Sequence, residues 1–283
     1  MPNKAYLELT NICNLDCSFC HKTKRAPRMI SDTEFTRAAT QLRTFADYLY
    51  FHLMGEPLLH PRLTDYITEA SEMGFRAVIT TNGTLLGRCA DALLSSPVYK
   101  VSISLHSYEA NKNAITIDSY LNDCFSFAKR AAEKGIICVL RLWNEGGCEN
   151  TLNSEIIARM HEFFDTDGTT VWKETYSGYK IAEYLFLETA ERFEWPDENA
   201  QIRSESHYCY GLGDQVGVLC DGTVVPCCLD ADGSIALGNI FDEELSDILM
   251  SERVQNMRAA FRCRKVTEEL CRRCGYAAAK KFR

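Results

Sequence analysis

The sequence lacks three features that would place it in a broad functional class. It has no run of about 18 apolar residues and no charged-then-apolar signal segment, so we expect neither a membrane span nor secretion. Basic residues are outnumbered, with 31 Lys and Arg against 39 Asp and Glu and a formal net charge of −8. Proteins that bind nucleic acid typically show the opposite balance. We therefore expect a cytoplasmic protein that binds neither membranes nor nucleic acid.

Cysteine, in contrast, is abundant, with 14 among 283 residues. A reducing cytoplasm does not hold structural disulfides, so this number indicates metal or redox chemistry. Seven cysteines form two spaced groups, and the other seven lie mostly in apolar or helical segments where no chemistry is expected. The N-terminal group is Cys13, Cys17 and Cys20, and the C-terminal group is Cys209, Cys227, Cys271 and Cys274.

Short β-rich runs alternate with helical stretches through the first two thirds of the chain, which predicts a parallel sheet. A Ser-x-x-Glu capping box at Ser31 begins a helix that runs to Phe45, and a second helix over 63–73 ends at Gly74. The fold class is therefore α/β, a partial (β/α)6 TIM-like barrel over residues 1–195, open on one side. Residues 144–179 are the least regular part. Strands are expected at 6–9, 48–53, 77–80, 100–105, 136–140 and 184–187.

The composition changes after Trp195-Pro196, where Gly, Cys and Asp become frequent. Asp221-Gly222 between two apolar runs predicts a β-hairpin, and helices are expected over 243–251 and 252–261. We therefore expect residues 196–283 to form a small cysteine-rich α+β domain, too small to fold without its cysteine site.

The N-terminal cysteines follow the first predicted strand directly, in a loop at the C-terminal mouth of the barrel, where active sites of such folds lie. An electron-transfer cubane normally takes four cysteines, so three leave one iron open. An open iron can bind a substrate or cosubstrate. The alternative is a zinc site with His21 as the fourth ligand, but an adjacent Cys20-His21 pair is an awkward chelate.

The segment from Cys13 to Cys20, with Phe19 before the last cysteine, resembles the radical S-adenosylmethionine (SAM) superfamily and its C-x-x-x-C-x-aromatic-C pattern. The resemblance implies that the three cysteines bind a 4Fe-4S cluster whose open iron chelates SAM. One electron, from a donor such as flavodoxin or ferredoxin, then cleaves SAM to a 5′-deoxyadenosyl radical that abstracts hydrogen from the substrate. Phe19 would lie near the adenine.

Further segments at strand ends extend the resemblance. Met54-Gly55-Glu56-Pro57 is similar to the superfamily's G-G-E-P element, which binds the SAM amino group, with Met54 in place of the first glycine. Alternatives are a buried or capping role for Glu56 and a barrel-lining or solvated role for Ser104 and Arg141. The SAM-contacting residues that the resemblance implies are Gly55, Glu56, Pro57, Asn82, Ser104 and Arg141.

The C-terminal cysteine spacing resembles the auxiliary-cluster domain called SPASM and its shortened form, twitch. Four thiolates would close a second, auxiliary 4Fe-4S cluster suited to electron transfer. Because the sequence ends soon after Cys274, we expect one such cluster, the twitch arrangement. A four-cysteine zinc ribbon is the alternative.

Relatives with one auxiliary cluster include dehydrogenases that oxidise a secondary alcohol of an aminocyclitol. Other relatives modify peptides and often carry an N-terminal module that binds a leader peptide. In the present sequence few residues precede the first strand, which favours a small-molecule substrate. We therefore expect a redox reaction, similar to alcohol dehydrogenation, on a small molecule. The alternatives are an enzyme that modifies a peptide or protein as a maturase or epimerase, and a non-catalytic iron–sulfur or zinc-binding protein.

Overall fold

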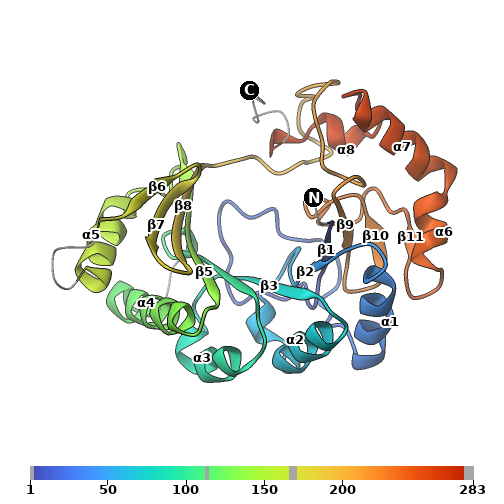
Figure 1. Cartoon of the computed structure of the whole chain (residues 1–283). Coiled ribbons are helices and arrows are strands. Elements are labelled where there is room, and N and C mark those ends of the chain that lie inside the picture. The colour runs from blue at the N-terminus through green and yellow to red at the C-terminus, as the bar shows by residue number, and fades with distance from the viewer. Residues whose placement is uncertain (1–2, 112–114, 166–170, 277–283) are drawn as a thin grey trace.

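A computed structural model describes residues 3–111, 115–165 and 171–276, and within them eleven strands form one sheet (Figure 1). The strand order is β11-β10-β9-β1-β2-β3-β4-β5-β8-β7-β6. The strands of the N-terminal part are β1 (Lys4–Leu7), β2 (Tyr48–Tyr50), β3 (Arg76–Thr81), β4 (Lys100–Ser104), β5 (Ile137–Glu145), β6 (Lys173–Thr175), β7 (Gly178–Ala182) and β8 (Leu185–Glu191). Those of the C-terminal part are β9 (Gln215–Val218), β10 (Thr223–Val225) and β11 (Gly238–Asn239).

Six neighbouring strands, β1 to β5 and β8, run parallel and confirm the six that the sequence predicts. The sheet curves without closing, with the helices along its outer side (Figure 1), which confirms the open partial barrel. The helices are α1 (Asp32–Leu42), α2 (Leu63–Glu72), α3 (Leu86–Ser95), α4 (Ile117–Glu133) and α5 (Asn153–Phe164).

Local sequence sets the helix limits near the cysteine loop. Ser31 N donates to Glu34 Oε2 (2.9 Å) at the start of α1, and Gly74, with a φ of +92°, follows the end of α2. Phe35 of α1 stacks on Tyr66 of α2 with ring centres 4.1 Å apart. Both side chains are buried, so the first two helices pack as one layer against the outer face of the sheet.

The irregular segment before β8 holds a hairpin that the sequence did not predict. Strands β6 and β7 pair antiparallel and continue the sheet beyond β8. All three residues of β6 are exposed, so this edge strand has no apolar alternation that a sequence pattern could detect.

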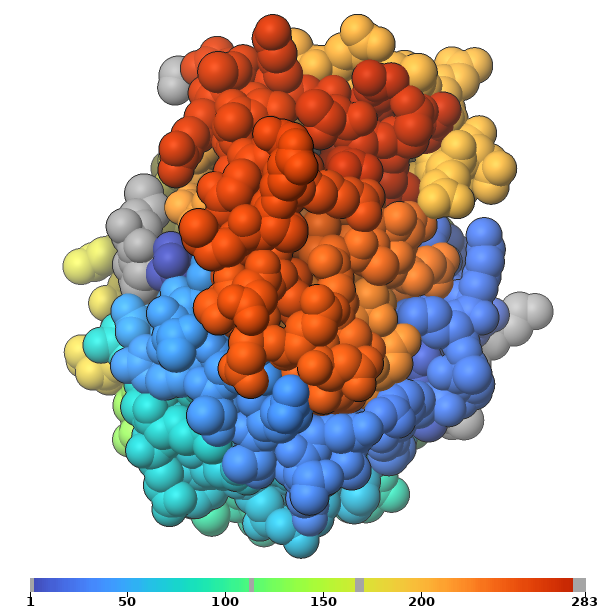
Figure 2. All heavy atoms as spheres, turned by 90° about the vertical axis from the view of Figure 1, so that its right-hand side faces the viewer, coloured from blue at the N-terminus to red at the C-terminus, as the bar shows by residue number. Residues whose placement is uncertain are grey.

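The C-terminal part continues the barrel sheet, because β9 pairs parallel with β1. The predicted hairpin at Asp221-Gly222 is confirmed between β9 and β10, and Figure 2 shows the C-terminal segments in close contact with the N-terminal ones. Residue 196 as the domain boundary stays a prediction. The remaining helices are α6 (Leu245–Met250), α7 (Glu252–Arg262) and α8 (Glu269–Arg272). In the described ranges, no helix has the length and apolar character needed to cross a bilayer.

Candidate functional site

The loop that carries the N-terminal cysteine group leaves β1 and returns to it. Its two ends are joined by Thr10 Oγ1, which donates to Arg28 O (2.9 Å), and by Asn11 Nδ2, which donates to Ala26 O (2.9 Å). The loop is therefore closed at its base, and the cysteines project from the C-terminal end of the barrel strands.

Each sulfur atom of this group accepts an N–H contact. The pairs are Leu15 N with Cys13 Sγ (3.4 Å), Asn111 Nδ2 with Cys17 Sγ (3.1 Å) and Lys22 N with Cys20 Sγ (3.5 Å). Burial raises the pKa of all three thiols, that of Cys17 to about 11, while these donors favour the thiolate that a metal requires. The donor set thus fits an iron–sulfur cluster. No sequence pattern marks Asn111.

The segment after β2 lies directly against the cysteine loop. Gly55 has a φ of +75°, and a Cβ there would lie 2.1 Å from Thr10 O, so glycine is required. Pro57, the first residue of the 3₁₀ turn Pro57–Leu59, is buried. This close approach places the backbone of Gly55 beside the base of the loop.

Glu56 is almost fully buried, and its carboxylate is already hydrogen-bonded. It accepts from Leu58 N (3.0 Å), Thr81 Oγ1 (2.8 Å) and Asn82 N (2.8 Å). Burial nevertheless raises the pKa of Glu56 to about 7, against the effect of these donors. Glu56 thus ties the end of β3 to the segment after β2, and it has acceptor capacity left for one more donor.

Asn82 faces the cysteine loop from the end of β3. Its Nδ2 donates to Asn14 Oδ1 (3.0 Å) and lies 3.9 Å from Cys13 Sγ. Its Oδ1 accepts from Thr84 N (3.0 Å), which fixes the amide orientation. The loop, Glu56 and Asn82 therefore meet at one end of the barrel.

Ser104 and Arg141 are register partners on β4 and β5. Arg141 points into the barrel, where its Nε lies 3.3 Å from Glu188 Oε2 and its guanidinium 4.3 Å from the centre of the Trp143 ring. Burial lowers the pKa of Arg141, although Glu188 opposes the shift. Arg141 therefore lines the barrel interior with a carboxylate partner, which rules out the alternative of a solvated surface residue.

Phe19 lies beside His106, with ring centres 5.0 Å apart. Burial lowers the pKa of His106 to about 4, so its ring is neutral at pH 7, and Nδ1 lies 3.0 Å from Arg141 O. The pair forms an aromatic wall near the cysteine loop. His106 is a candidate contact outside the site residues that we predict from the sequence, because a lone histidine near a strand end is more often simply packed.

The C-terminal cysteines come from three distant segments and approach one another. Burial raises the pKa of Cys227 well above its usual value, and the neighbouring thiols of Cys228, Cys209 and Cys271 raise it further. Burial also raises the pKa of Cys209, to which the nearby Cys274 contributes. Among the described residues, no three His, Cys, Asp or Glu side chains are arranged to hold a single metal ion. A cubane accepts a wider spacing, because each thiolate binds a different iron.

The neighbouring cysteines have other partners. Cys228 packs against a small buried cluster that contains Tyr6 of β1, and Cys220 Sγ lies 3.6 Å from Arg25 Nη1. His21, the fourth ligand of the zinc alternative, has its Nε2 3.3 Å from Asp232 Oδ2. Because Cys228, Cys220 and His21 have these other partners, we do not assign them as cluster ligands.

The two cysteine groups lie at opposite ends of the barrel strands. The N-terminal group follows β1, whereas Cys209 lines a surface cavity together with Asn3 and Phe45, which precede β1 and β2. The barrel interior therefore lies between them.

Comparison with known families identifies the region around each of the two cysteine groups. The sequence model of the radical SAM superfamily matches residues 7–144, and that of the SPASM iron–sulfur cluster-binding domain matches residues 209–275. The chain belongs to the radical SAM superfamily. The cofactors of this radical SAM protein are thus a SAM-binding 4Fe-4S cluster, an auxiliary 4Fe-4S cluster and SAM. The ligand residues remain our assignment.

Two curated relatives illustrate the range of the superfamily. A tungsten-containing aldehyde ferredoxin oxidoreductase cofactor-modifying protein of Pyrococcus furiosus is 38% identical over 86 residues, which cover 29% of this radical SAM protein and 24% of the relative. A probable GTP 3′,8-cyclase of Sulfurisphaera tokodaii is 23% identical and covers 89% of this chain and 88% of its own. The chain thus spans about a quarter of the first relative and most of the second.

Two solved structures share the fold. BtrN in complex with AdoMet and 2-DOIA has a TM-score of 0.60 at 18% identity, covering 97% of this radical SAM protein and 93% of that chain. SuiB of Streptococcus suis bound to the precursor peptide SuiA has a TM-score of 0.63 at 16% identity, covering 98% and 70%. At these identities the likeness concerns the fold alone.

Proposed function

We propose that this radical SAM enzyme oxidises a small molecule in a reaction similar to alcohol dehydrogenation. When bound, SAM at the N-terminal cluster supplies the radical that takes a hydrogen atom, and the auxiliary cluster supplies an electron acceptor. The balance requires the substrate to lose that hydrogen atom and then one proton and one electron, which leaves a carbonyl group. The chain must therefore hold the substrate between its two ends.

The observation that carries the proposal is a cavity of about 340 Å³ within the barrel. It opens at the N-terminal ends of the strands, and its lining includes Tyr50, Val139, Lys100 and Glu188. The volume is at the lower end of the range for small-molecule sites. Lys100 and Glu188 provide charged groups of both signs that can orient a polar substrate.

Tyrosine side chains connect this cavity with the C-terminal cysteines. Tyr50 lines the cavity and packs on Tyr6 with ring centres 4.8 Å apart, and Cys228 packs against the same small buried cluster that contains Tyr6. Cys228 is adjacent to the assigned ligand Cys227. A substrate in the cavity would thus lie close, through packed side chains, to the auxiliary cluster.

The relationship to BtrN supports a small-molecule substrate, since that structure contains the ligand 2-DOIA. Modification of a peptide is the second candidate, and it is favoured by the structural similarity to SuiB, which was solved with its precursor peptide. A cavity of this size accepts one side chain of a peptide only if the rest of the peptide lies outside the barrel.

Transfer of deuterium tests the proposal. The reconstituted, reduced protein is supplied with SAM and with polyols or aminocyclitols deuterated at the carbinol carbon, and 5′-deoxyadenosine is analysed by mass spectrometry. We expect deuterium in the nucleoside and a ketone product. Transfer from a peptide instead would support the second candidate, and the absence of 5′-deoxyadenosine under all conditions would contradict both.

A further inference from the structure

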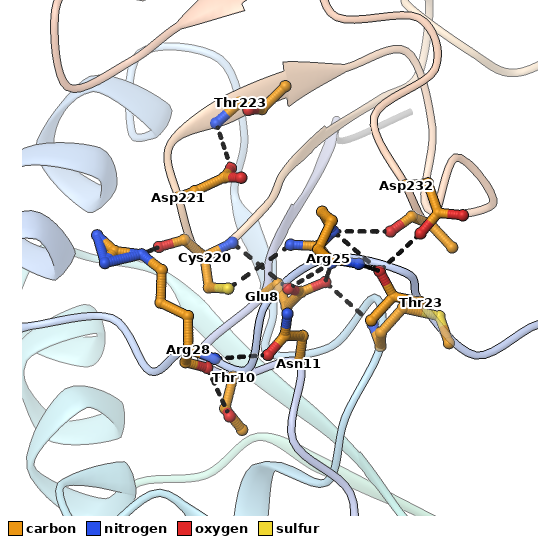
Figure 3. Close-up of polar contacts among 12 residues, drawn as sticks. Glu8, Thr10, Asn11, Thr23, Arg25, Arg28, Cys220, Asp221, Thr223 and Asp232 are labelled. Atoms are coloured by element: carbon orange, nitrogen blue, oxygen red, sulfur yellow. Dashed lines mark hydrogen bonds and ion pairs between the residues drawn. The ribbon is translucent and has the colours of Figure 1, made fainter.

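A buried carboxylate lies where the barrel, the cysteine loop and the C-terminal hairpin meet (Figure 3). Glu8 directly follows β1, and its side chain is 0% exposed. Both of its oxygens accept from Arg25 Nη2, at 2.8 and 2.7 Å. Arg25 belongs to the segment that returns from the cysteine loop to the barrel.

The same carboxylate reaches two further segments. Glu8 Oε2 lies 3.3 Å from the donor Met54 N, at the start of the segment that we assign to the SAM amino group. Glu8 Oε1 lies 3.5 Å from Cys220 N, in the hairpin between β9 and β10. One side chain thus contacts the cysteine loop, the SAM segment and the C-terminal hairpin, and it is itself part of the barrel.

Arg25 completes this connection from the other side. Its Nε donates to Ala231 O (3.0 Å), and its Nη1 lies 3.6 Å from Cys220 Sγ, both in the C-terminal part. The guanidinium therefore bridges the barrel and the C-terminal part, whereas a surface ion pair joins only two exposed side chains.

A second carboxylate, from the C-terminal part, holds the residues before Arg25. Asp232 Oδ1 accepts from Thr23 Oγ1 (2.6 Å) and Lys24 N (2.9 Å), and Figure 3 shows Asp232 and Glu8 on either side of this segment. We call residues 21–25 the strap. The strap directly follows Cys20 and is held by one acid of the barrel and one acid of the C-terminal part.

Stability alone does not account for this arrangement. A buried ion pair is weak evidence of stabilisation, because desolvation of both charges offsets much of their attraction. The ion pair does, however, hold four segments in one relative position: the end of β1, the segment that contains Arg25, the SAM segment and the C-terminal hairpin. Any movement that unpairs the buried charge is costly. The feature to explain is therefore which segments are joined.

We propose that Glu8 and Arg25 are positioning residues that fix the SAM segment Met54–Pro57 relative to the cysteine loop and the C-terminal hairpin. The strap transmits the position of the C-terminal part to the SAM segment. Coupling between binding sites is reciprocal, so SAM binding also stabilises the strap and the hairpin. The proposal concerns SAM and is independent of the substrate.

The test uses the reconstituted full chain as wild type, Glu8→Gln, Arg25→Lys and Asp232→Asn. SAM affinity is measured by calorimetry, hydrogen exchange of the strap is measured with and without SAM, and the reduced N-terminal cluster is examined by electron paramagnetic resonance. We expect Asp232→Asn to weaken SAM binding about fivefold, which is the lower end of typical couplings. Glu8→Gln should weaken it further, and Arg25→Lys, which keeps the charge, should lie between wild type and Glu8→Gln.

The matched control is Asp91→Asn, which breaks the exposed ion pair with Arg130 on the outer helices α3 and α4 and should match wild type. If Glu8→Gln does not fold, the test rests on Asp232→Asn. The Asp232 side chain is 20% exposed, so this change removes no buried charge pair and the variant should fold. The proposal would be overturned if the variants exchange the strap amides faster but keep the SAM affinity and the paramagnetic resonance spectrum of wild type. It would also be overturned if hydrogen exchange of the strap is unchanged in the variants. Gly55→Ala tests the assignment of the SAM segment separately: if it also leaves SAM affinity unchanged, that assignment is wrong and the coupling has lost its basis.

Discussion

The two cysteine groups differ in how the chain assembles them. The N-terminal group lies within one short loop whose ends are joined by Thr10 and Asn11. The C-terminal group gathers Cys209, Cys227 and the pair Cys271 and Cys274 across more than sixty positions of sequence. Local sequence therefore specifies the first site, whereas the second forms only when the β9–β10 hairpin and α8 are in place.

Removal of the N-terminal ligands should have the largest effect. Changing Cys13, Cys17 and Cys20 together to Ala should lower the iron content from about eight to about four atoms per chain, because each cubane holds four. Formation of 5′-deoxyadenosine should cease. Iron analysis and chromatography measure the two effects, and nucleoside formation by the variant would contradict our ligand assignment.

Removal of a C-terminal ligand should separate SAM cleavage from substrate oxidation. Cys227→Ala should lose about four irons per chain and should still cleave SAM, while product formation stops. The exposed Cys263 provides the control, since Cys263→Ala should retain all iron. Bound zinc in wild type, with about four irons, would show that the second site is a zinc site.

The pKa of Glu56 predicts a pH dependence of SAM binding. Burial raises this pKa to about 7, so the carboxyl group of the SAM-free protein becomes protonated as the pH falls below 7. The N–H groups of the SAM amino group, which this segment would bind, favour the ionised carboxylate as their acceptor, so SAM affinity should fall by up to about tenfold for each pH unit below 7. Calorimetry at pH 6 to 8 measures the slope, and Glu56→Gln should bind weakly with no slope. An equal slope in both proteins would assign the titration to another group.

Loss of the Asn111 contact should have the smallest effect. Asn111→Leu removes the N–H donor to Cys17 Sγ without changing a ligand. Hydrogen bonds to cluster sulfurs tune the reduction potential, so the potential of the N-terminal cluster should become more negative and activity should fall about tenfold. A redox titration followed by paramagnetic resonance tests this. An unchanged potential would show that the contact is only structural.

The sequence predicted the parts of the molecule that depend on local pattern. The six parallel strands, the capping box at Ser31 and the hairpin at Asp221-Gly222 each follow from periodicity or turn chemistry within a few residues. The exposed strand β6 has no such pattern. Residues such as Asn111 and Glu8 acquire partners only through the fold, because their contacts join positions far apart in the sequence.

The pairing of β1 with β9 has a consequence for the order of folding. Strand β1 is synthesised early, but one of its edges is completed only by residues 215–218. During synthesis on the ribosome, β1 therefore has an unpaired edge while most of the barrel has already emerged, and such edges favour aggregation. We expect truncation before residue 215 to leave the nascent barrel dependent on chaperones.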